Sequence, residues 1–412
     1  MTIIRAALSA LCISLNGAAS AAGQAAPVRA FTGLTLIDGT DRAPVANATI
    51  VVQDGRVVRA GPAMSVAVPP EAERISLAGK TVIPGLINVH GHVNTPQDLL
   101  TYAAYGVTTV FSLGGEPPEV FVARELQATP QLTRARVLVS GPVLTPHTVD
   151  EARALVDSVA RQKVDIVKIR VDDNLGTAQK MSPEVYRAVI AEAHKRQLRV
   201  ASHLFYLADA KALLMSGTDF IAHSVRDAEV DTDFLNALKA RGICYCPTLM
   251  REVSTFVYES TPEWFSDPLF LRHANAEWVK SLVDPVRQQA TRNNASAQRY
   301  KVALEVASRN LKKIADAGLP IAMGTDTGPT GRFQGYFELM ELELMVKAGL
   351  TPRQALAAAT RDAARCMKLD ALGTLERGKW ADFVVLDADP VANISNVRRI
   401  ADVYVAGNRV PR

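Results

Sequence analysis

The sequence predicts an α/β protein, a (β/α)8 TIM barrel with a small β-sandwich domain built from both chain ends. Apolar runs alternate with helical patterns through the middle of the chain, and strand-like segments occupy both ends. The length of 412 residues is enough for a large barrel with an appended domain. A composition of 48% hydrophobic and 21% charged residues excludes disordered, collagen-like and disulfide-scaffold proteins.

The two ends of the chain are rich in β-branched residues and tight turns. Residues 28–83 contain the runs LTLIDGTD, ATIVVQDGRVVRAG and ERISLAGKTVI, and residues 374–412 contain ADFVVLDADP and VRRIADVYVAGNRV. Val, Ile and Thr between Gly and Asp turns favour short strands. We therefore expect 28–83 and 374–412 to form one composite β-sandwich beside a barrel of residues 84–373.

Eight apolar strand candidates alternate with helical segments between those ends. One helix is expected to begin with Ser182 as its N-cap and Pro183 at its first position. A doubly wound parallel sheet is the alternative fold, but no Gly-rich phosphate fingerprint follows the first strand. The strand candidates are residues 85–92, 108–115, 136–143, 165–173, 199–205, 219–225, 243–249 and 320–327.

The first residues of the chain are typical of an export signal. Arg5 is followed by the apolar stretch 6–15 and by the small-residue cleavage pattern ASA at 19–21. The apolar stretch is too short to span a bilayer, which needs about 20 residues. We therefore predict a signal peptide at 1–21, a periplasmic or secreted mature chain, and no membrane insertion. A disordered or buried N-terminal helix is the alternative.

The net charge of the chain bears on the kind of partner that it binds. Lys plus Arg total 46 and Asp plus Glu 42, a formal net charge of +4 without a like-charged block, which gives no case for a nucleic-acid partner.

The cysteines of the mature chain are expected to be reduced. Cys12 would leave with the signal peptide. The remaining Cys244, Cys246 and Cys366 are expected to be buried free thiols. Cys244 and Cys246 would lie about 7 Å apart on one strand, near the limit for a disulfide.

One connection between strand candidates is much longer than the others. Residues 251–309 follow the seventh strand candidate and include two of the three Trp residues of the chain. Loops that follow barrel strands lie on the face where barrels carry out their chemistry. We therefore expect this insertion to act either as a lid over the site or as a contact between subunits.

Polar side chains gather at the C-terminal ends of the strand candidates. His90 and His92 are two residues apart, so both face one side of the first strand. Each such residue alone is more simply a core histidine, a turn or a helix cap. Burying all of them unpaired at one barrel mouth would cost several kcal/mol each, whereas a pair of metal ions satisfies them together. The predicted metal ligands are His90, His92, Lys168, His203, His223 and Asp326.

Lys168 is a basic residue among the apolar residues of the fourth strand candidate, where a charged amine would be costly to bury. Imidazole and carboxylate groups suit zinc and similar divalent ions, but two cations side by side need an anionic bridge. An apolar strand would depress the pKa of Lys168, and its neutral amine could react with carbon dioxide to give an anionic carbamate. We therefore expect two divalent metal ions, Zn²⁺ foremost, and carbon dioxide for the carboxylation of Lys168.

These residues carry a family resemblance. VHGH after VIPGLIN, followed in strand order by Lys168, His203, His223 and Asp326, resembles the amidohydrolase superfamily in its binuclear branch with a carboxylated lysine. The segment GTLERGKWADFVVLDADP is similar to the C-terminal part of the β domain in that family. Within the superfamily the chain looks most like the exported imidazolonepropionase-like and Xaa-Pro dipeptidase-like hydrolases.

The resemblance implies how the roles are divided at this centre. Asp326 would pass the proton of a bridging hydroxide to the leaving group, and carboxylated Lys168 would bridge the two ions. The sequence HLFYLAD lacks the Glu that deaminases of the superfamily carry after the fifth-strand His. An even-numbered homo-oligomer is also expected from the family. The implied ligands are His90, His92 and Asp326 for one ion, His203 and His223 for the other, and Lys168 for both.

Substrate recognition is expected from His147, Arg170 and Arg226. Arg170 lies two residues after the strand lysine, and a guanidinium there suits a carboxylate or phosphate group. Pairing of Arg170 with Asp172 or Asp173 at the barrel rim is the alternative. His147 follows the third strand, where relatives often place a substrate-contacting His, and Arg226 follows the sixth strand. Either residue would otherwise contact only neighbouring loops or solvent.

The predicted function is an exported, binuclear metal-dependent hydrolase. It would cleave an amide bond in a small carboxylate-bearing molecule, a dipeptide or an N-acyl amino acid. An ester, lactone, carbamate or phosphotriester hydrolase on the same metals is the alternative, because each reaction is hydroxide attack on a polarised centre. A non-catalytic binding protein on this fold is a third class, which the complete set of ligand positions disfavours.

Overall fold

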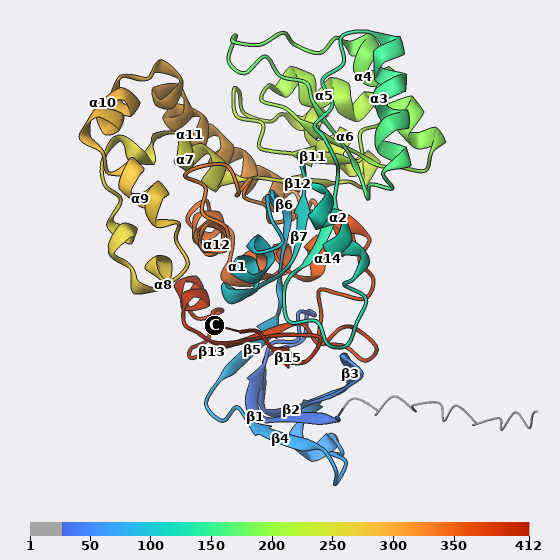
Figure 1. Ribbon diagram of the computed structural model, residues 1–412, viewed down its shortest axis with the longest axis vertical. Coiled ribbons are helices and arrows are strands. Elements are labelled where there is room, and N and C mark those ends of the chain that lie inside the picture. Colours follow the sequence, from blue (N-terminus) through green and yellow to red (C-terminus); the bar gives the residue numbers. More distant parts are fainter. Residues whose placement is uncertain (1–26, 412) are drawn as a thin grey trace, which may run out of the picture.

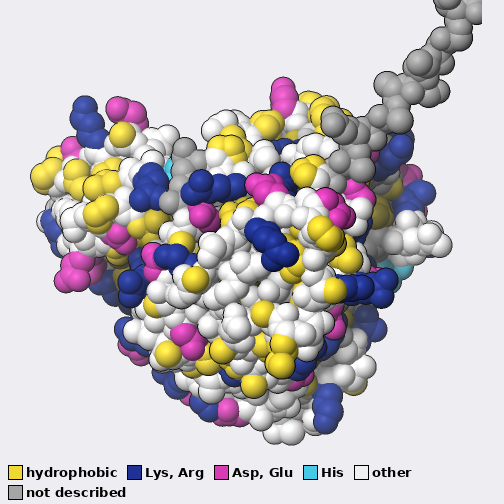
Figure 2. All heavy atoms as spheres, turned by 90° about the horizontal axis from the view of Figure 1, so that it is seen from below, with side chains coloured by type: hydrophobic (Ala, Val, Ile, Leu, Met, Phe, Trp, Pro, Cys, Tyr) yellow, Lys and Arg dark blue, Asp and Glu magenta, His cyan; other side chains and the backbone are white. Residues whose placement is uncertain are grey.

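The structure is a computed structural model that describes residues 27–411, so the predicted signal peptide at 1–21 lies outside the described residues. The strands of both chain ends lie together at one end of the molecule, below the barrel in Figure 1. Figure 2 views the molecule from that side, and acidic and basic side chains both occur across the face. Within the described residues, no helix has the length and apolar character needed to span a membrane.

One mixed sheet joins the first and last strands of the described chain. Its strand order is β15-β14-β13-β5-β1-β2-β3, and β4 pairs with β1. The two chain ends meet where β5 and β13 pair antiparallel, with Pro84 opposite Phe383. The strands are β1 (Arg29–Leu36), β2 (Val45–Gln53), β3 (Arg56–Pro62), β4 (Glu73–Ser76), β5 (Thr81–Pro84), β13 (Phe383–Leu386), β14 (Ile400–Val405) and β15 (Asn408–Arg409).

This sheet curls around its own core. Phe31 on β1 packs edge-on against Tyr404 on β14, with 4.9 Å between the ring centroids. The two strands are three positions apart in the sheet, where neighbours are spaced about 4.8 Å. Phe383 lies in the same core and contacts both rings. Strands from both chain ends therefore pair in one curled sheet, and not in the two separate sheets of the predicted β-sandwich.

The middle of the chain forms the strands of a barrel, and every pairing between them is parallel. β6 to β8 form one sheet and β9 to β12 form another. Both faces of these strands are buried, which is why their sequences are continuous apolar runs. The strands are β6 (Leu86–Gly91), β7 (Val107–Ser112), β8 (Arg136–Val139), β9 (Val167–Arg170), β10 (Val200–His203), β11 (Phe220–Ala222) and β12 (Cys244–Cys246).

The extended segment 320–327 closes the ring as the eighth strand position. The amide of Val89 on β6 donates to the carbonyl of Met323 at 2.9 Å. On the other side, the amide of Ala322 donates to the carbonyl of Tyr245 on β12 at 3.0 Å. These bonds confirm the predicted eight-stranded barrel. The isolated parallel bridges that complete the ring join Leu144 to Ile169, Tyr245 to Ile321 and Gly91 to Thr327.

Helices surround the barrel strands. Ser182 caps α4 as predicted, because its side chain accepts a hydrogen bond from the amide of Val185 and Pro183 occupies the first turn. The helices are α1 (Asp98–Ala104), α2 (Pro118–Glu125), α3 (Val149–Arg161), α4 (Pro183–Lys195), α5 (Leu207–Ser216), α6 (Thr232–Arg241), α12 (Tyr336–Lys347), α13 (Pro352–Ala358) and α14 (Arg361–Met367).

The long insertion after β12 is helical and packs on the barrel through aromatic side chains. Trp264 contacts Phe337 of α12 edge-on, with 5.6 Å between ring centroids. The hydroxyl of Tyr105 also donates to the carbonyl of Leu269 at 2.9 Å. Its role as a lid or as a subunit contact stays a prediction. The helices of this region are α7 (Leu249–Phe256), α8 (Pro268–Leu271), α9 (Ala276–Leu282), α10 (Pro285–Asn293) and α11 (Ala295–Asp316).

The prediction of three free thiols is wrong. Cys244 at the start of β12 forms a disulfide with Cys366 of α14, and their Cα atoms are 5.8 Å apart. The two residues are 122 positions apart in the sequence, and only the folded barrel brings α14 under the N-terminal end of β12. Cys246 is a buried free thiol, as expected.

A buried ion pair joins the barrel floor to the β domain. Arg136 begins β8, and its Nε donates to Asp382 Oδ2 at 3.0 Å. A second guanidinium nitrogen donates to the carbonyl of Gln127 at 2.8 Å. Asp382 Oδ1 accepts from the amide of Ala406 at 2.7 Å, and the guanidinium lies 4.2 Å from the centre of the Trp380 ring. The charges of this pair are therefore balanced and hydrogen-bonded by the protein itself.

Candidate metal centre

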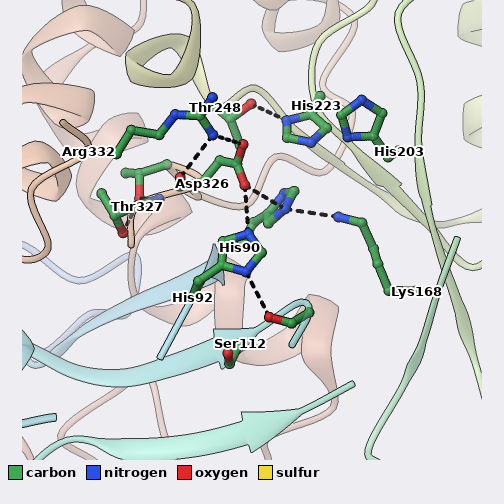
Figure 3. Close-up of polar contacts among 12 residues, drawn as sticks. His90, His92, Ser112, Lys168, His203, His223, Thr248, Asp326, Thr327 and Arg332 are labelled. Carbon is green, nitrogen blue, oxygen red and sulfur yellow. Dashed lines mark hydrogen bonds and ion pairs between the residues drawn. The ribbon is translucent and has the colours of Figure 1, made fainter. Parts of the chain in front are cut away.

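The six predicted ligands meet at the C-terminal mouth of the barrel (Figure 3). They lie in or directly after β6, β9, β10 and β11, and in the segment 320–327. Parallel strands place their C-terminal ends on one face, which is why residues far apart in sequence converge here. The side chains of His90, Lys168 and His223 are almost fully buried, and those of His92, His203 and Asp326 are mostly buried.

Direct contacts connect the N-terminal and C-terminal parts of the centre. His92 Nε2 lies 2.9 Å from Asp326 Oδ1, and His90 Nε2 lies 3.4 Å from the same oxygen. Lys168 Nζ points inward and lies 2.9 Å from His90 Nε2. The structure therefore brings the strand lysine and Asp326 together with the histidine cluster, while their role as metal ligands stays a prediction.

Hydrogen bonds to the far side of two rings fix their orientation. His92 Nδ1 donates to the carbonyl of Gly114 at 3.1 Å, which leaves Nε2 facing Asp326. His223 Nδ1 bonds the hydroxyl of Thr248 at 2.8 Å. Such outer partners fix the ring orientation and the tautomer of metal-binding histidines.

Unpartnered nitrogen atoms test whether the site fits a metal ion. His223 Nε2 and His90 Nδ1 are buried and have no hydrogen-bond partner among the described residues. One ligand atom each of His90, His223 and Asp326 lies within 4.8 Å of the other two. An unpaired buried acceptor is costly, and a cation removes that cost. The donor set therefore fits a divalent ion that prefers nitrogen and oxygen ligands.

His203 lies beside the other histidines but has a protein partner. Its ring centroid is 4.3 Å from that of His223. Its Nε2 is 3.0 Å from Asp172 Oδ2, so this nitrogen faces a carboxylate and not the centre of the cluster. The sequence predicts Asp172 only as a partner of Arg170. The alternation of Lys168, Arg170 and Asp172 along one strand face is the sequence signal that would have placed it at the site.

Three residues of the centre have backbone conformations that are rare for residues other than Gly. The φ angles are 96° at His223, 48° at Thr248 and 58° at Asp326. Positive φ costs side-chain-bearing residues of the order of 1–3 kcal/mol each, and such residues cluster at active sites. The fold therefore holds these three side chains in place against a local backbone preference.

Burial sets the protonation states. Burial, followed by the charge of Lys168, lowers the pKa of His90 well below its usual value, and burial with His203 does the same for His223. Burial lowers the pKa of His203 to about 4 in spite of Asp172. Neutral imidazoles are the form that binds metal ions. Burial also lowers the pKa of Lys168 to about 8, which favours the neutral amine that carboxylation requires.

Asp326 keeps its charge in spite of burial. Burial alone would raise the pKa of its carboxyl group, but Arg332, His92 and His90 together hold that pKa well below the usual range. Arg332 contacts Asp326 Oδ2, while Oδ1 faces the histidines (Figure 3). Sequence reasoning missed Arg332, because it lies in a loop whose path no local pattern predicts.

A buried network positions the strand segment that carries Asp326. Glu338 Oε1 accepts hydrogen bonds from Asn88 at 2.6 Å, from Thr325 at 2.8 Å and from Thr327 at 2.6 Å. Burial raises the pKa of Glu338. Sequence reasoning also missed this residue, because it lies on α12 and reaches the strand end only in the folded barrel.

Two of the predicted substrate residues lie together at the rim. His147 is exposed, and it lines a hollow of about 210 Å³ with Arg170 and Asp172. Arg170 Nε donates to Asp172 Oδ1 at 3.0 Å, which is the rim pairing that was the alternative for this residue. Contact of His147 and Arg170 with a substrate stays a prediction.

The third predicted substrate residue, Arg226, is enclosed by protein. Its side chain has no exposed area, and its Nε lies 3.0 Å from Glu252 Oε1. Another nitrogen of the guanidinium donates to the carbonyls of Leu204 at 2.9 Å and Ser224 at 2.6 Å. The direct substrate contact expected for Arg226 is therefore corrected to a buried ion pair, because sequence position alone could not reveal Glu252 beside it.

The eight parallel barrel strands, with buried His, Lys and Asp side chains at their C-terminal ends, define a TIM-barrel protein with a candidate metal centre. The chain belongs to the amidohydrolase family, whose profile matches residues 81–410. The match covers the barrel together with β5 and all three C-terminal strands of the β domain, β13 to β15.

Named relatives and solved structures agree with this family. An ochratoxinase of Aspergillus niger is 27% identical over 268 residues, which are 62% of this chain, and the match spans only 47% of the length of that relative. An imidazolonepropionase of Streptomyces avermitilis is 22% identical over 89% of this chain and 87% of its own. The crystal structure of a candidate prolidase from Bifidobacterium longum covers 94% of this chain and 96% of its own, with a TM-score of 0.77 and 28% identity.

Proposed function

We propose that this protein is an exported hydrolase that uses two divalent metal ions, Zn²⁺ foremost, to cleave an amide bond. The proposed substrate is a small carboxylate-bearing molecule, a dipeptide or an N-acyl amino acid. The observation that carries the proposal is the convergence of buried neutral histidines, an inward-pointing lysine and a charged aspartate at one barrel mouth. The names of the relatives, an ochratoxinase, an imidazolonepropionase and a candidate prolidase, support an amide as the bond that is cleaved.

The chain's own residues would divide the work. Metal ions at this centre would polarise the scissile carbonyl and lower the pKa of the attacking water. One ion would be held by His90, His92 and Asp326, and the other by His203 and His223, after His203 turns its ring away from Asp172. Lys168, once carboxylated by carbon dioxide, would supply the anionic bridge that two neighbouring cations require.

Asp326 is the residue placed to move the proton. Its carboxyl group is charged, because Arg332 and the histidines outweigh the effect of burial on its pKa. A charged carboxylate at the centre accepts a proton from the attacking water and delivers it to the nitrogen of the leaving group. Amide cleavage needs this delivery, since an amine leaves as a neutral molecule only after protonation.

Export of the chain is supported by its disulfide. Disulfide bonds form and persist in oxidising compartments such as the periplasm or the extracellular space. The Cys244–Cys366 bond agrees with a chain that leaves the cytoplasm through a signal peptide at 1–21. Assembly into a homo-oligomer stays a family expectation.

A hydrolysis screen of the mature, zinc-loaded protein tests the function. The panel contains dipeptides, N-acyl amino acids, lactones, carbamates and phosphotriesters. We expect cleavage of dipeptides or N-acyl amino acids, and activity confined to lactones or phosphotriesters would overturn the amide assignment.

Metal content gives a second readout that does not depend on the substrate. Wild-type protein should retain about two metal ions per chain after dialysis. His223→Ala should lose metal, because it removes the buried and unpartnered nitrogen. The matched control His194→Ala removes an imidazole from α4 that pairs with Asp219 at the surface, and it should retain both ions. Full metal content in His223→Ala would contradict the proposed ligand set.

A further inference from the structure

Three arginine side chains lie together on the side of the metal centre where the insertion begins. Arg226 follows β11, Arg251 lies on α7, and Arg332 precedes α12. Each residue follows one of three neighbouring positions of the barrel ring, β11, β12 and the segment 320–327. The proposed reaction gives none of these guanidinium groups a contact with the substrate, and Arg332 enters it only through the charge of Asp326.

Glu252 balances part of this positive charge. Its Oε1 lies 3.0 Å from Arg226 Nε, and its Oε2 accepts from a terminal nitrogen of Arg251 at 3.0 Å. Arg251 also donates to the hydroxyl of Tyr300 at 3.1 Å. One carboxylate thus serves two guanidinium groups, and its own side chain is fully buried.

Donor groups of this cluster are left without partners. Arg251 Nε and two nitrogens of Arg226, Nε and one terminal nitrogen, are buried and have no hydrogen-bond partner among the described residues. The one acceptor of the cluster in the same state is Glu252 Oε1, which lies 3.0 Å from Arg226 Nε. Buried donors without acceptors are rare in proteins, and charged ones are the most costly. The cluster therefore has the capacity to accept a further anionic group.

Arg332 is the member of the cluster closest to the reacting atoms. It contacts Asp326 Oδ2, and its Nε donates to the hydroxyl of Ser254 on α7 at 3.1 Å. Ser254 in turn donates to the carbonyl of Arg251 at 2.7 Å, so its hydroxyl connects Arg332 to the backbone of Arg251. The Arg332 side chain keeps 19% of its surface exposed, so a small molecule can reach it.

Asp326 cannot fully neutralise the charge of Arg332 while it also binds cations. When its carboxylate faces metal ions, the negative charge that Arg332 receives from it is shared. The cluster then holds three guanidinium groups against Glu252 and a shared Asp326. A carboxylate has the charge and the two-oxygen geometry that a guanidinium binds best.

We propose that Arg332 and Arg251 form an anion subsite beside the metal centre, which binds the carboxylate of the substrate. The inference rests on the proposed function and deepens it, since it states where the charged end of the substrate lies. The subsite is on the opposite side of the ring from Arg170, which ends β9 and is paired with Asp172. It places the substrate between the metal centre and the first helix of the insertion.

A pair of ligands of nearly the same shape, one charged and one neutral, tests this subsite. N-acetyl-L-leucine carries the carboxylate, and N-acetyl-L-leucinamide, in which an NH2 group replaces one carboxylate oxygen, is the neutral counterpart. Binding of both compounds to the zinc-loaded protein is measured by calorimetry, and hydrolysis is measured in parallel. We expect wild-type protein to prefer the carboxylate. Arg332→Met should lose about 10- to 100-fold of that preference, the amount expected for charged hydrogen bonds. Arg251→Met should lose less, because Glu252 and Tyr300 also hold Arg251.

Controls separate anion binding from other effects. Arg299→Met removes the same charge from an exposed position next to Tyr300 and should keep the preference. An equal fall in kcat for both compounds in Arg332→Met, with the preference intact, would overturn the proposal, because Arg332 would then act only through Asp326. Loss of the preference in Arg170→Met instead, or no preference in wild-type protein, would also overturn it.

Two further measurements keep the test decisive. Zinc content and thermal unfolding show whether each variant is folded and loaded. Should Arg332→Met not fold, Arg332→Lys keeps the charge but not the two-pronged geometry, and it should lose about 10-fold of the preference. If wild-type protein binds the carboxylate selectively but hydrolyses neither compound nor any other amide, the subsite stands and the proposed function fails.

Discussion

The two ends of the barrel bury charged groups in different ways. At the floor, Arg136 and Asp382 satisfy each other, and backbone groups complete their hydrogen bonds. At the mouth, ring nitrogens of His90 and His223 are buried without partners. Both regions lie in the same rigid fold, so the difference is not one of packing quality. Buried charged groups whose ion pairs and hydrogen bonds are all made within the protein hold its domains together. Buried polar groups that lack a hydrogen-bond partner in the protein indicate a place for a ligand.

The largest expected effect is on catalysis at the mouth. Asp326→Asn keeps the shape of the side chain but removes its ability to accept a proton, so kcat should fall about 10²- to 10⁴-fold. Steady-state kinetics with the best substrate from the screen measure this change in kcat. A variant that retains near wild-type kcat would show that another group moves the proton.

The floor should respond in stability and not in chemistry. Arg136→Met leaves Asp382 buried without its cation, which should lower the free energy of unfolding by about 3–5 kcal/mol. Urea unfolding measures the loss, and kcat/KM per folded chain should not change. The double variant Arg136→Met/Asp382→Leu removes both charges and should recover most of the stability. No recovery would mean that the pair contributes by more than mutual neutralisation.

Removal of the metal ions should destabilise the mouth. Ions that bind only the folded chain stabilise it by about 2.7 kcal/mol when the free ion concentration is 100 times its dissociation constant. Dialysis against a chelator should therefore lower the unfolding temperature, and zinc should restore it. The shift should be the same in Arg136→Met, because the floor and the mouth are separate sites. A chelator-insensitive unfolding temperature would contradict a metal site at the mouth.

The smallest expected effect is a pH dependence of the metal-free protein. Burial lowers the folded-state pKa of Lys168 from the ordinary 10.5 to about 8. Between these values the unfolded chain binds the proton and the folded chain releases it, so stability should rise with pH in that window. The expected gain is about 1 kcal/mol between pH 8 and pH 9. Urea unfolding in carbon dioxide-free buffer should show this slope in wild-type protein and not in Lys168→Met.

Sequence patterns predicted the barrel strands and the residues that converge at their C-terminal ends because both depend on local regularities. The alternation of His90 and His92 and the polar ends of apolar runs follow directly from strand geometry. Lys168 stood out because it interrupts an apolar strand that is buried on both faces. In such cases the residues next to a side chain in the sequence are enough to predict its environment in the fold.

The parts that escaped prediction depend on elements far apart in sequence. Arg332 and Glu338 reach the site from a loop and from a helix, and only tertiary packing sets their positions. The Cys244–Cys366 disulfide joins a strand to a helix 122 residues later. Arg226 was expected to contact a substrate because of its place after a strand, but Glu252 from α7 encloses it. Long-range pairing of this kind leaves no local signal.

The pairing of β5 with β13 has a consequence for how the chain is made. About 300 residues separate the end of β5 at Pro84 from the start of β13 at Phe383. At a synthesis rate of roughly 5–20 residues per second, β5 waits roughly 15–60 s for the strand that covers its edge. An uncovered strand edge invites pairing with other chains during that time. Production of this protein should therefore benefit from conditions that slow aggregation of nascent chains more than from conditions that speed translation.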